Sequence, residues 1–370
     1  MNRLFMLAPL PAVRRRTRLA KMVPVLQSLG IRVFFHGWER DKGEAAEWQS
    51  DGLDERVILR GGGYASARAR LMYPLWMAAV FFRVLGLGRK ADLFCLGWET
   101  AFPALLASYI TGARIIFDDA DRFSLVMKLP GGLNHIVQAL EKWTSRKVLL
   151  HIVPSLSRYE WNGANMVVLR NTPSMADYAK AGAVRPDRGT EPFTLYANGW
   201  VGETRGAPVF LALMQRVEAS RLPVKMVVAG RVDSKAGREL IAHPYVSYRG
   251  ELGQVDALKI YREVDLALTF YDPAVPINRL AESNKWGDCV FFGVPFVVND
   301  EVETANPFIS SGAAFSLPYH DVDALFVLVA RLAKAPDEVA AHGKALDLFR
   351  EEYGPFDRRF GDLMSAALGA

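Results

Sequence analysis

The sequence predicts an α/β protein built from two consecutive doubly wound domains. Short apolar runs that are typical of buried strands alternate along the chain with longer segments of helical periodicity. With 370 residues, of which 51% are hydrophobic, the chain can form two cores. A polar connector at residues 178–191, rich in Gly, Arg and Asp, separates the two halves. We therefore expect two Rossmann-like domains that face a central cleft, with ligands bound at the carboxyl ends of the strands.

In the first half, the apolar residues at the start predict a strand. They are interrupted by Pro9 and Pro11, are followed by three arginines and lack a small-residue cleavage site, so we expect a buried strand rather than a signal peptide. The predicted strands are 4–8, 32–36, 57–59, 92–96, 114–117, 149–153 and 166–169, and the predicted helices are 16–29, 101–110 and 134–147.

The second half repeats this scheme. The predicted strands are 193–197, 224–229, 245–248, 265–269 and 296–298, and the predicted helices are 208–219, 254–263 and one around 339–353, with further elements at 313–317 and 322–332. Phe356, Phe360 and Leu363 recur at near-helical spacing in the last segment, 355–368. We expect residues 1–175 with 354–370 to form the first domain, residues 190–353 to form the second, and the last segment to cross back and brace the first.

The charge of the chain is unevenly distributed. It has 45 basic and 40 acidic residues, but no acid precedes Glu39 and none lies between Arg56 and Asp92. The basic residues are mixed with apolar runs and belong to no nucleic-acid-binding module, so we expect no nucleic-acid partner.

Cys95 and Cys289 lie in apolar surroundings, which is typical of buried thiols in a reducing compartment. The six histidines have no metal-ligand spacing, so we expect neither a metal nor a cofactor.

The second acid-free interval contains the apolar segment 71–88. It is interrupted by Pro74 and Arg83 and is shorter than the roughly 20 residues of a membrane-spanning helix, so we expect no transmembrane helix. Aromatic and aliphatic side chains beside basic ones are typical of a segment that docks on anionic lipid. The alternative is a helix packed under the sheet, with arginines at its rim. The expected membrane-docking residues are Arg14, Arg15, Arg16, Arg68, Arg70, Trp76 and Arg83.

Residues 281–300, AESNKWGDCVFFGVPFVVND, predict a loop, a helix and a buried strand. Asn284 and Lys285 fall in the first helical turn, where backbone N–H groups and the helix dipole favour a phosphate. Asp288, one turn further on, can accept hydrogen bonds from a ribose. The alternative is an ordinary helix start, because lysines and acids are common at such positions.

This segment resembles the donor domain of GT-B glycosyltransferases, and within them the membrane-associated glucuronosyltransferase of xanthan assembly and its bacterial exopolysaccharide relatives. The resemblance covers residues 245–299. The matching positions are Glu251 in GEL, Tyr271 after a strand, Lys285, Phe291-Phe292-Gly293 and Pro295. In the GT-B fold the second domain binds a nucleotide sugar and the first binds the acceptor, and the resemblance implies the same arrangement here.

The resemblance also implies roles for individual residues. Lys285 would neutralise the donor diphosphate, and Asp288 would lie near the ribose. Glu251 and Tyr271 would border the nucleotide pocket. The expected donor-binding residues are Lys285, Asn284, Asp288, Glu251, Tyr271, Arg205, Gly199 and Arg231.

Two loops at strand ends supply part of that list. Related enzymes place a phosphate-binding Arg or Lys just before a Gly after the first strand of this domain, and Arg205-Gly206 fits that pattern. Alternatively, the loop is an ordinary one with a solvated arginine. Gly230-Arg231 follows the next strand and is the weaker candidate.

The first half contains the candidate catalytic base. The motif IIFDDADRFS places Asp118, Asp119 and Asp121 directly after a strand, and inverting sugar transfer requires a carboxylate that takes the proton of the acceptor hydroxyl. Relatives of the xanthan enzyme place an aspartate four residues after the aromatic that ends this strand. We therefore expect Asp121 to be the base, Asp119 to be the second candidate, and Glu99 in GWET to orient the acceptor or the base. Alternatively, one of these acids caps the following turn or pairs with Arg122.

The expected activity is transfer of a sugar, with glucuronate as one candidate, from a UDP-sugar to a polyprenyl-diphosphate-linked glycan at the cytoplasmic face of the cell membrane. Many retaining GT-B enzymes carry two glutamates eight apart where this chain has Leu280 and Asp288, which favours inversion. Four alternatives stay open: a retaining transferase on a soluble or lipopolysaccharide acceptor, a soluble transferase with a non-lipid acceptor, a nucleotide-sugar 2-epimerase, and a non-catalytic membrane-docking adaptor.

Overall fold

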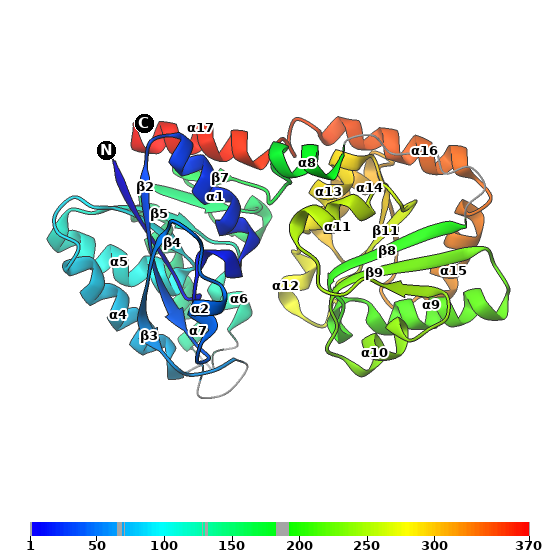
Figure 1. The fold of residues 1–370 in the computed structure, drawn as a ribbon, viewed down its shortest axis with the longest axis horizontal. Helices are drawn as coiled ribbons and strands as arrows, with labels where there is room; N and C mark the ends of the chain where they lie inside the picture. The colour runs from blue at the N-terminus through cyan, green and yellow to red at the C-terminus, as the bar shows by residue number, and fades with distance from the viewer. Residues whose placement is uncertain are drawn as a thin grey trace. The chain divides into compact units, whose positions relative to one another are not determined.

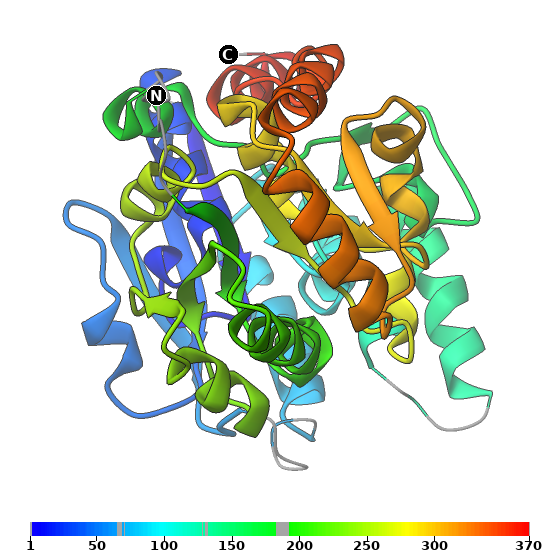
Figure 2. The same cartoon turned by 90° about the vertical axis from the view of Figure 1, so that its right-hand side faces the viewer.

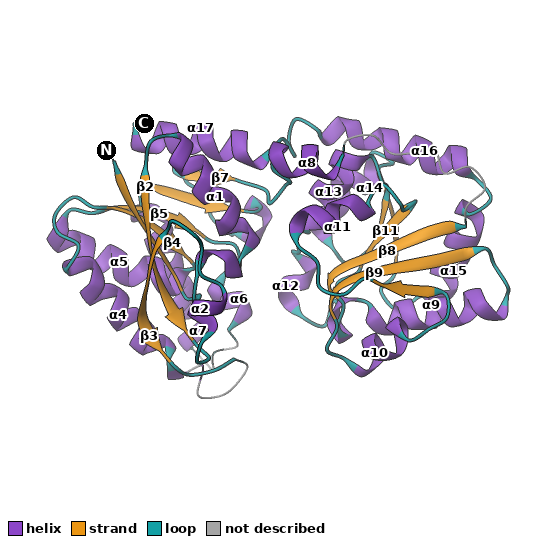
Figure 3. Cartoon of the chain, in the orientation of Figure 1, coloured by secondary structure: helices purple, strands orange, loops and turns teal. Residues whose placement is uncertain are grey.

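The computed structural model describes residues 2–64, 69, 71–127, 129, 132–182 and 192–369. The chain forms two compact units (Figure 1). The first unit contains Met1–Leu169 and Phe356–Ala370, and the second contains Arg170–Pro355. Each unit is a parallel sheet covered by helices, so the prediction of two Rossmann-like domains is confirmed (Figure 3).

The sheet of the first unit has seven parallel strands in the order β3-β2-β1-β4-β5-β6-β7. The order reverses between β1 and β4, and doubly wound sheets bind ligands at the carboxyl ends of the strands beside such a reversal. The strands are β1 (Arg3–Ala8), β2 (Arg32–Glu39), β3 (Asp54–Arg60), β4 (Asp92–Leu96), β5 (Arg114–Asp118), β6 (Leu150–Val153) and β7 (Met166–Val168).

Two apolar cores cover the two faces of this sheet, because successive side chains of a strand point to opposite faces. Leu4 and Met6 of β1 belong to the core shared with α1 and α17, and Leu7 belongs to the core shared with α4, α5 and α7. The longer helices are α1 (Thr17–Ser28), α4 (Tyr73–Leu85), α5 (Trp98–Thr111), α7 (Leu133–Lys147) and α17 (Phe356–Leu368). The short ones are η1 (Val13–Arg15), α2 (Glu44–Glu47), α6 (Phe123–Val126) and η2 (Leu156–Arg158).

The C-terminal helix α17 belongs to the first unit, as the sequence predicts. Phe356, Phe360, Met364 and Leu368 repeat every four residues and are all buried against the core that contains α1. A buried ion pair fixes α1 in turn, because Arg18 donates to both carboxylate oxygens of Asp118, at 2.8 and 3.0 Å. Asp118 therefore has a structural role at the end of β5.

The second unit has six parallel strands in the order β10-β9-β8-β11-β12-β13, with the reversal between β8 and β11. Figure 2 shows these strands side by side, coloured green to orange. They are β8 (Phe193–Trp200), β9 (Val224–Arg231), β10 (Val246–Tyr248), β11 (Leu266–Thr269), β12 (Phe296–Asn299) and β13 (Ala314–Leu317).

The helices of the second unit follow the same alternation. They are α8 (Met175–Ala181), α9 (Ala207–Ala219), α10 (Lys235–Ile241), α11 (Gln254–Ile260), α12 (Pro276–Arg279), α13 (Asn284–Phe292), α14 (Asn306–Ser310), α15 (Val322–Leu332) and α16 (Pro336–Ala345), with 3-10 turns η3 (Glu203–Arg205), η4 (Glu303–Ala305) and η5 (Leu346–Phe349).

Every strand predicted from the sequence is present, within a few residues at each end. Three details differ. Strand β8 continues to Trp200, through the segment predicted as a loop, because its pairing with β9 extends to Gly199 and Trp200. The helix predicted for 254–263 ends at Ile260, and the helix predicted around 339–353 ends at Ala345 and continues as η5.

Candidate functional site

Each sheet has a cavity at the carboxyl ends of its strands, beside the reversal of strand order, with a volume of about 380 Å³ in the first unit and only about 10 Å³ in the second. In the second unit the cavity lies between the ends of β8 and β11, where Asn198 and Phe270 line it. In the first unit it lies between the ends of β1 and β4, where Leu10 and Gly97 line it. These are the positions at which the sequence predicts the donor-binding and catalytic residues.

Two cations converge in the second unit. The guanidinium carbon of Arg205 lies 4.6 Å from the centroid of the Tyr271 ring, and Nζ of Lys285 lies 5.9 Å from the same centroid. Within the part of the chain that the structure describes, no carboxylate lies within salt-bridge distance of either cation. Neither Lys285 nor Arg205 therefore has an ion-pair partner among the described residues, which leaves both cations available to an anionic ligand. Of the eight residues predicted to bind the donor, Lys285 and Arg205 thus both lie over the ring of Tyr271.

Backbone groups complete this site, which we call the cradle: Lys285, Arg205, the ring of Tyr271 and the helix starts beside them. Lys285 is the second residue of α13, and a side chain added at Gly199 would place its Cβ 3.8 Å from Nζ of Lys285. Gly206 precedes α9 with φ +87°, and a Cβ there would lie 2.6 Å from Phe210 and 2.8 Å from Phe270, so only glycine fits. The chain thus brings the N-terminal turns of α9 and α13, with their positive dipole ends, to the two cations.

Asp288 lies behind the cradle rather than in it. It is 8% exposed, and its charge helps to raise the pKa values of Tyr196 and Tyr261, although burial is the larger cause for both. A side-chain hydrogen bond from Asn198 to each of these two tyrosines lowers their pKa values and so opposes the effect of burial. Asp288 is therefore buried beside Tyr196 and Tyr261, and its predicted place near the ribose stays a prediction.

The other predicted donor-binding residues are at the surface. Asn284 is exposed at the start of α13, and Glu251 is exposed after β10. Arg231 pairs with Asp233 at 3.0 Å, and Trp200 donates to the same carboxylate at 2.9 Å. The charge of Arg231 is thus already balanced by a neighbour. Roles for Asn284, Glu251 and Arg231 in binding the donor stay predictions.

The cavity of the first unit has a volume of about 380 Å³, in the range of small-molecule sites. It contains acidic, basic and aromatic side chains together, a set that can bind a sugar through its hydroxyl groups and its apolar faces. Its lining residues are Pro9, Leu10, Arg16, Arg40, Tyr64, Tyr73, Leu96, Gly97, Glu99, Ala120, Asp121, Phe123, Val126 and Met127.

The three aspartates after β5 have different environments. Asp121 lines the cavity, is 56% exposed, and lies 3.5 Å from both Arg16 and Arg158. Asp119 is 1% exposed and accepts a 2.7 Å hydrogen bond from the Tyr159 hydroxyl, with His151 beside it. Asp119 is therefore buried and does not line the cavity, so the geometry favours Asp121, and the assignment of the base stays a prediction. Asp121 keeps the accessibility that the role requires.

Glu99 is the second carboxyl of the cavity. It lies in the first turn of α5, and burial raises its pKa from 4.5 to about 7, with the nearby charge of Asp119 adding to the effect. Its carboxyl group folds over Gly97, where a Cβ would lie 2.7 Å from Oε2, so a side chain at position 97 would displace it. A carboxyl that titrates near neutral pH can exchange a proton with a ligand in this cavity.

The predicted membrane-docking residues divide into three groups. Trp76 is 0% exposed, stacks on Trp38 and donates its indole N–H to Thr100, so its assignment to the membrane surface is wrong. It packs α4 on α5, as the alternative of a helix under the sheet predicts. Arg68 and Arg70 lie outside the described residues.

The remaining arginines of that set make local contacts. Arg14 donates to the carbonyl of Gln49, Arg15 lies 3.5 Å from Glu44, and Arg83 lies 3.1 Å from Nε2 of His36. Arg16 belongs to the cavity of the first unit instead. No helix in the described part of the chain is both long enough and apolar enough to cross a membrane.

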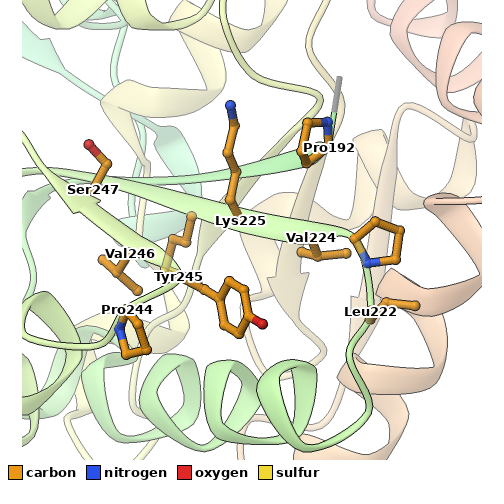
Figure 4. A pocket seen from close by; sticks show the side chains of 10 residues that line it. Pro192, Leu222, Val224, Lys225, Pro244, Tyr245, Val246 and Ser247 are labelled. Carbon is orange, nitrogen blue, oxygen red and sulfur yellow. The ribbon is translucent and has the colours of Figure 1, made fainter. Parts of the chain in front are cut away.

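A further cavity of about 350 Å³ lies at the opposite end of the second sheet, where β8, β9 and β10 begin (Figure 4). Among the described residues that line it, Pro192, Leu222, Pro244 and Tyr245 are apolar, and Lys225 is the charged one. It contains no residue predicted to be functional and lies away from the carboxyl ends of the strands.

Sequence reasoning missed residues that complete both sites. In the first unit these are Arg40, Tyr64 and Tyr73, and in the second Asn198 and Trp200. Arg40 directly follows β2, so its position at a strand's carboxyl end was a usable signal. Tyr64 and Tyr73 reach the cavity from a loop and from α4, which no spacing in the sequence indicates.

Comparisons with known proteins agree with this architecture. No protein-family model and no curated sequence matches the chain. Sucrose-phosphate synthase from Thermosynechococcus elongatus superposes with a TM-score of 0.69 at 12% identity, covering 100% of each chain. A UDP-N-acetylglucosamine 2-epimerase gives 0.60 at 14% identity, and S. aureus MnaA in a structure with UDP gives 0.60 at 13%, both covering 100% of this chain and 97% of theirs. At these identities the likeness establishes the GT-B fold.

Proposed function

We propose that the protein is a glycosyltransferase that moves a sugar from a UDP-sugar to an acceptor hydroxyl. The observation that carries this proposal is the pair of cations, Lys285 and Arg205, on the ring of Tyr271 at the reversal point of the second sheet. Fixed cations and helix N-termini stabilise the negative charge that develops on a departing nucleoside diphosphate. UDP is the favoured nucleotide because a structure with the same fold contains it.

The proposed reaction requires one proton transfer. The acceptor oxygen attacks the anomeric carbon, the bond between that carbon and the β-phosphate oxygen breaks, and its electron pair leaves with UDP. A carboxylate takes the hydroxyl proton, and the anomeric configuration inverts. In this scheme no metal is needed, because Lys285 and Arg205 supply the positive charge. Asp121 is the proposed base, since it is the accessible aspartate of the first unit's cavity.

We further propose that the acceptor is lipid-linked and is reached at an anionic membrane surface. Helices α4, α5 and α7 pack side by side and each expose apolar side chains, which we call the apolar face. The apolar face consists of Leu75, Phe82, Leu106, Tyr109, Ile110, Leu133 and Ile136. The only acids on the three helices, Glu99 and Glu141, are buried, whereas Arg146 and Lys147 are exposed. An exposed apolar surface with a basic rim is typical of membrane docking.

A nucleotide-sugar epimerase is the second candidate, because a UDP-N-acetylglucosamine 2-epimerase shares the fold over the whole chain. An epimerase would use the same cation pair to hold its UDP-sugar but would need no acceptor. The two candidates therefore differ in whether UDP-sugar turnover depends on a second substrate.

The test is release of UDP from UDP-glucose, UDP-glucuronate and UDP-N-acetylglucosamine, with and without polyprenyl-diphosphate-linked glycans in vesicles. We expect acceptor-dependent release that falls about 100-fold or more in Asp121→Asn, the usual effect of losing a general base, while UDP affinity is kept. Lys285→Ala should weaken both. Conversion of a UDP-sugar to its epimer without an acceptor would support the second candidate, and no turnover of any kind would contradict both.

A further inference from the structure

We propose that the cavity of the first unit recognises an acceptor that carries an oxyanion, and that Arg40 is the group that binds it. The inference rests on the proposed function, because it treats this cavity as the acceptor site. It goes beyond that function by naming the charged group that the acceptor must bring. The acceptor would be a sugar that bears a phosphate, a diphosphate or a carboxylate, because each of these groups is an oxyanion.

The first observation is the cage that holds Arg40. Its guanidinium carbon lies 3.9 Å from the centroid of the Trp38 ring and 5.3 Å from the rings of both Tyr64 and Tyr73. One N–H donates to the Tyr73 hydroxyl at 3.3 Å. Cation–π contacts with three rings hold the planar guanidinium in one orientation, so little side-chain entropy remains to be lost on binding.

The cage is itself fixed. Trp38 is buried and donates its indole N–H to the carbonyl of Gly61 at 2.8 Å. Tyr64 donates to Glu44 at 2.7 Å, and burial together with this hydrogen bond raises the pKa of Tyr64 to about 12, which keeps the phenol neutral. Arg40 is therefore held in a preorganised aromatic site and differs from an arginine that is free in solvent.

The second observation is that Arg40 forms no salt bridge within the described part of the chain. Among the residues that the structure describes, no carboxylate lies within salt-bridge distance of it, although Glu39 next to it pairs with Arg60 at 3.3 Å. An arginine has five N–H donors in a planar fork that matches an oxyanion. With one donor on Tyr73, the fork of Arg40 has capacity for a bidentate contact inside the cavity.

The remaining lining residues suit the uncharged part of such a ligand. Glu99 and Asp121 can accept hydrogen bonds from sugar hydroxyls, and Tyr73 and Phe123 present apolar surface. An anion held by Arg40 would fix the acceptor at one point and orient a hydroxyl toward the two carboxyls. A cavity of about 380 Å³ accommodates one or two sugar rings.

The experiment measures binding of small probes by calorimetry in the presence of excess UDP. Glucose 1-phosphate and pyrophosphate represent a phosphate or diphosphate ester, methyl glucuronide represents a uronic acid, and methyl glucoside is the neutral control. We expect the wild type to bind at least one anion about tenfold or more tighter than methyl glucoside. The anionic probe that binds most tightly shows whether the acceptor carries a phosphate, a diphosphate or a carboxylate.

Three variants test the assignment to Arg40. Arg40→Leu should abolish the preference for the anion, and Arg40→Lys should restore part of it, because a lysine keeps the charge and loses the fork. Arg60→Leu, at a 75% exposed arginine that also lies beside Glu39, is the matched control and should leave the preference unchanged. Equal binding of anions and methyl glucoside, no binding of any probe, or a preference that survives Arg40→Leu would overturn the proposal.

The two proposals fail separately. UDP affinity that depends on Lys285 reports the second unit and also checks that the Arg40 variants are folded. If the wild type binds UDP but binds no anion more tightly than methyl glucoside, the anion site is refuted and the transferase proposal stands. If the anion preference depends on Arg40 but UDP does not bind, the anion site stands and the proposal of a UDP-sugar transferase is refuted.

Discussion

At the scale of single residues, burial distinguishes four acids that follow β4 and β5. Asp118 is neutralised by Arg18, Asp119 is held by Tyr159, Asp121 is accessible, and Glu99 is buried with a raised pKa. The sequence placed all four at strand ends and ranked Asp121 first through a family resemblance, but it gave no information on their burial or partners. Their roles depend on partners that lie far along the chain, such as Arg18, which no local pattern reveals.

Glu99 makes stability depend on pH. Its pKa is raised by burial from 4.5 to about 7, so the folded protein keeps this proton through the pH window in which the unfolded chain loses it. The contribution to stability is fully present below pH 4.5 and is lost as pH rises through 7, by about 3 kcal/mol in total. Glu99→Gln should remove this dependence, which urea unfolding at pH 4.5, 6 and 8 would measure. An unchanged pH profile in the variant would show that Glu99 titrates normally.

At the scale of elements, the prediction of strands succeeded because both sheets are parallel and buried. Their strands are short apolar runs with clear boundaries, such as β5 and β12. The extension of β8 to Trp200 escaped prediction because Asn198 and Gly199 are typical of turns, and pairing with β9 overrides that tendency. The sequence predicts the packing of α4 under the sheet only as the alternative to membrane docking, because the exposed side of this helix is apolar as well.

Helix α17 is the element that closes the first unit. Phe360 is 0% exposed and lies edge-on to Phe94 of β4, at 6.2 Å between centroids. Phe360→Ala should lower the free energy of unfolding by about 3–5 kcal/mol, the usual cost of truncating a buried phenylalanine. Leu363→Ala, at a half-buried position of the same helix, is the control and should cost much less. Denaturant unfolding would measure both, and equal losses would contradict the packing described for α17.

At the scale of the whole molecule, the proposed chemistry is divided between two units, and the seven-stranded sheet of the first repeats the strand order of the six-stranded sheet of the second with one strand more. The second unit supplies the cations and the first supplies the carboxyls, and each set lies at the reversal point of its own sheet. The sequence predicted this division through the strand ends it identified. It could not predict the aromatic cage of Arg40, which assembles from β2, a loop and α4.

The apolar face should make membrane binding a property of the first unit. Replacing Phe82 and Ile110, which are 69% and 63% exposed, by serine should weaken binding to vesicles that contain anionic lipid by about tenfold or more. The matched control replaces Val327 and Leu348 of the second unit, which are 65% and 73% exposed. Vesicle sedimentation would compare the two double variants, and equal binding would place the docking surface elsewhere or exclude it.

The central claim is that the second unit binds the diphosphate of a nucleotide sugar through Lys285 and Arg205. Calorimetric titration of the purified protein with UDP in the absence of metal tests it most directly, with Lys285→Ala and the control Lys225→Ala, whose lysine lies at the opposite end of the same sheet. The account predicts micromolar binding that Lys285→Ala weakens about tenfold or more and Lys225→Ala leaves unchanged. Absence of binding by the wild type, or equal binding by all three proteins, would contradict it.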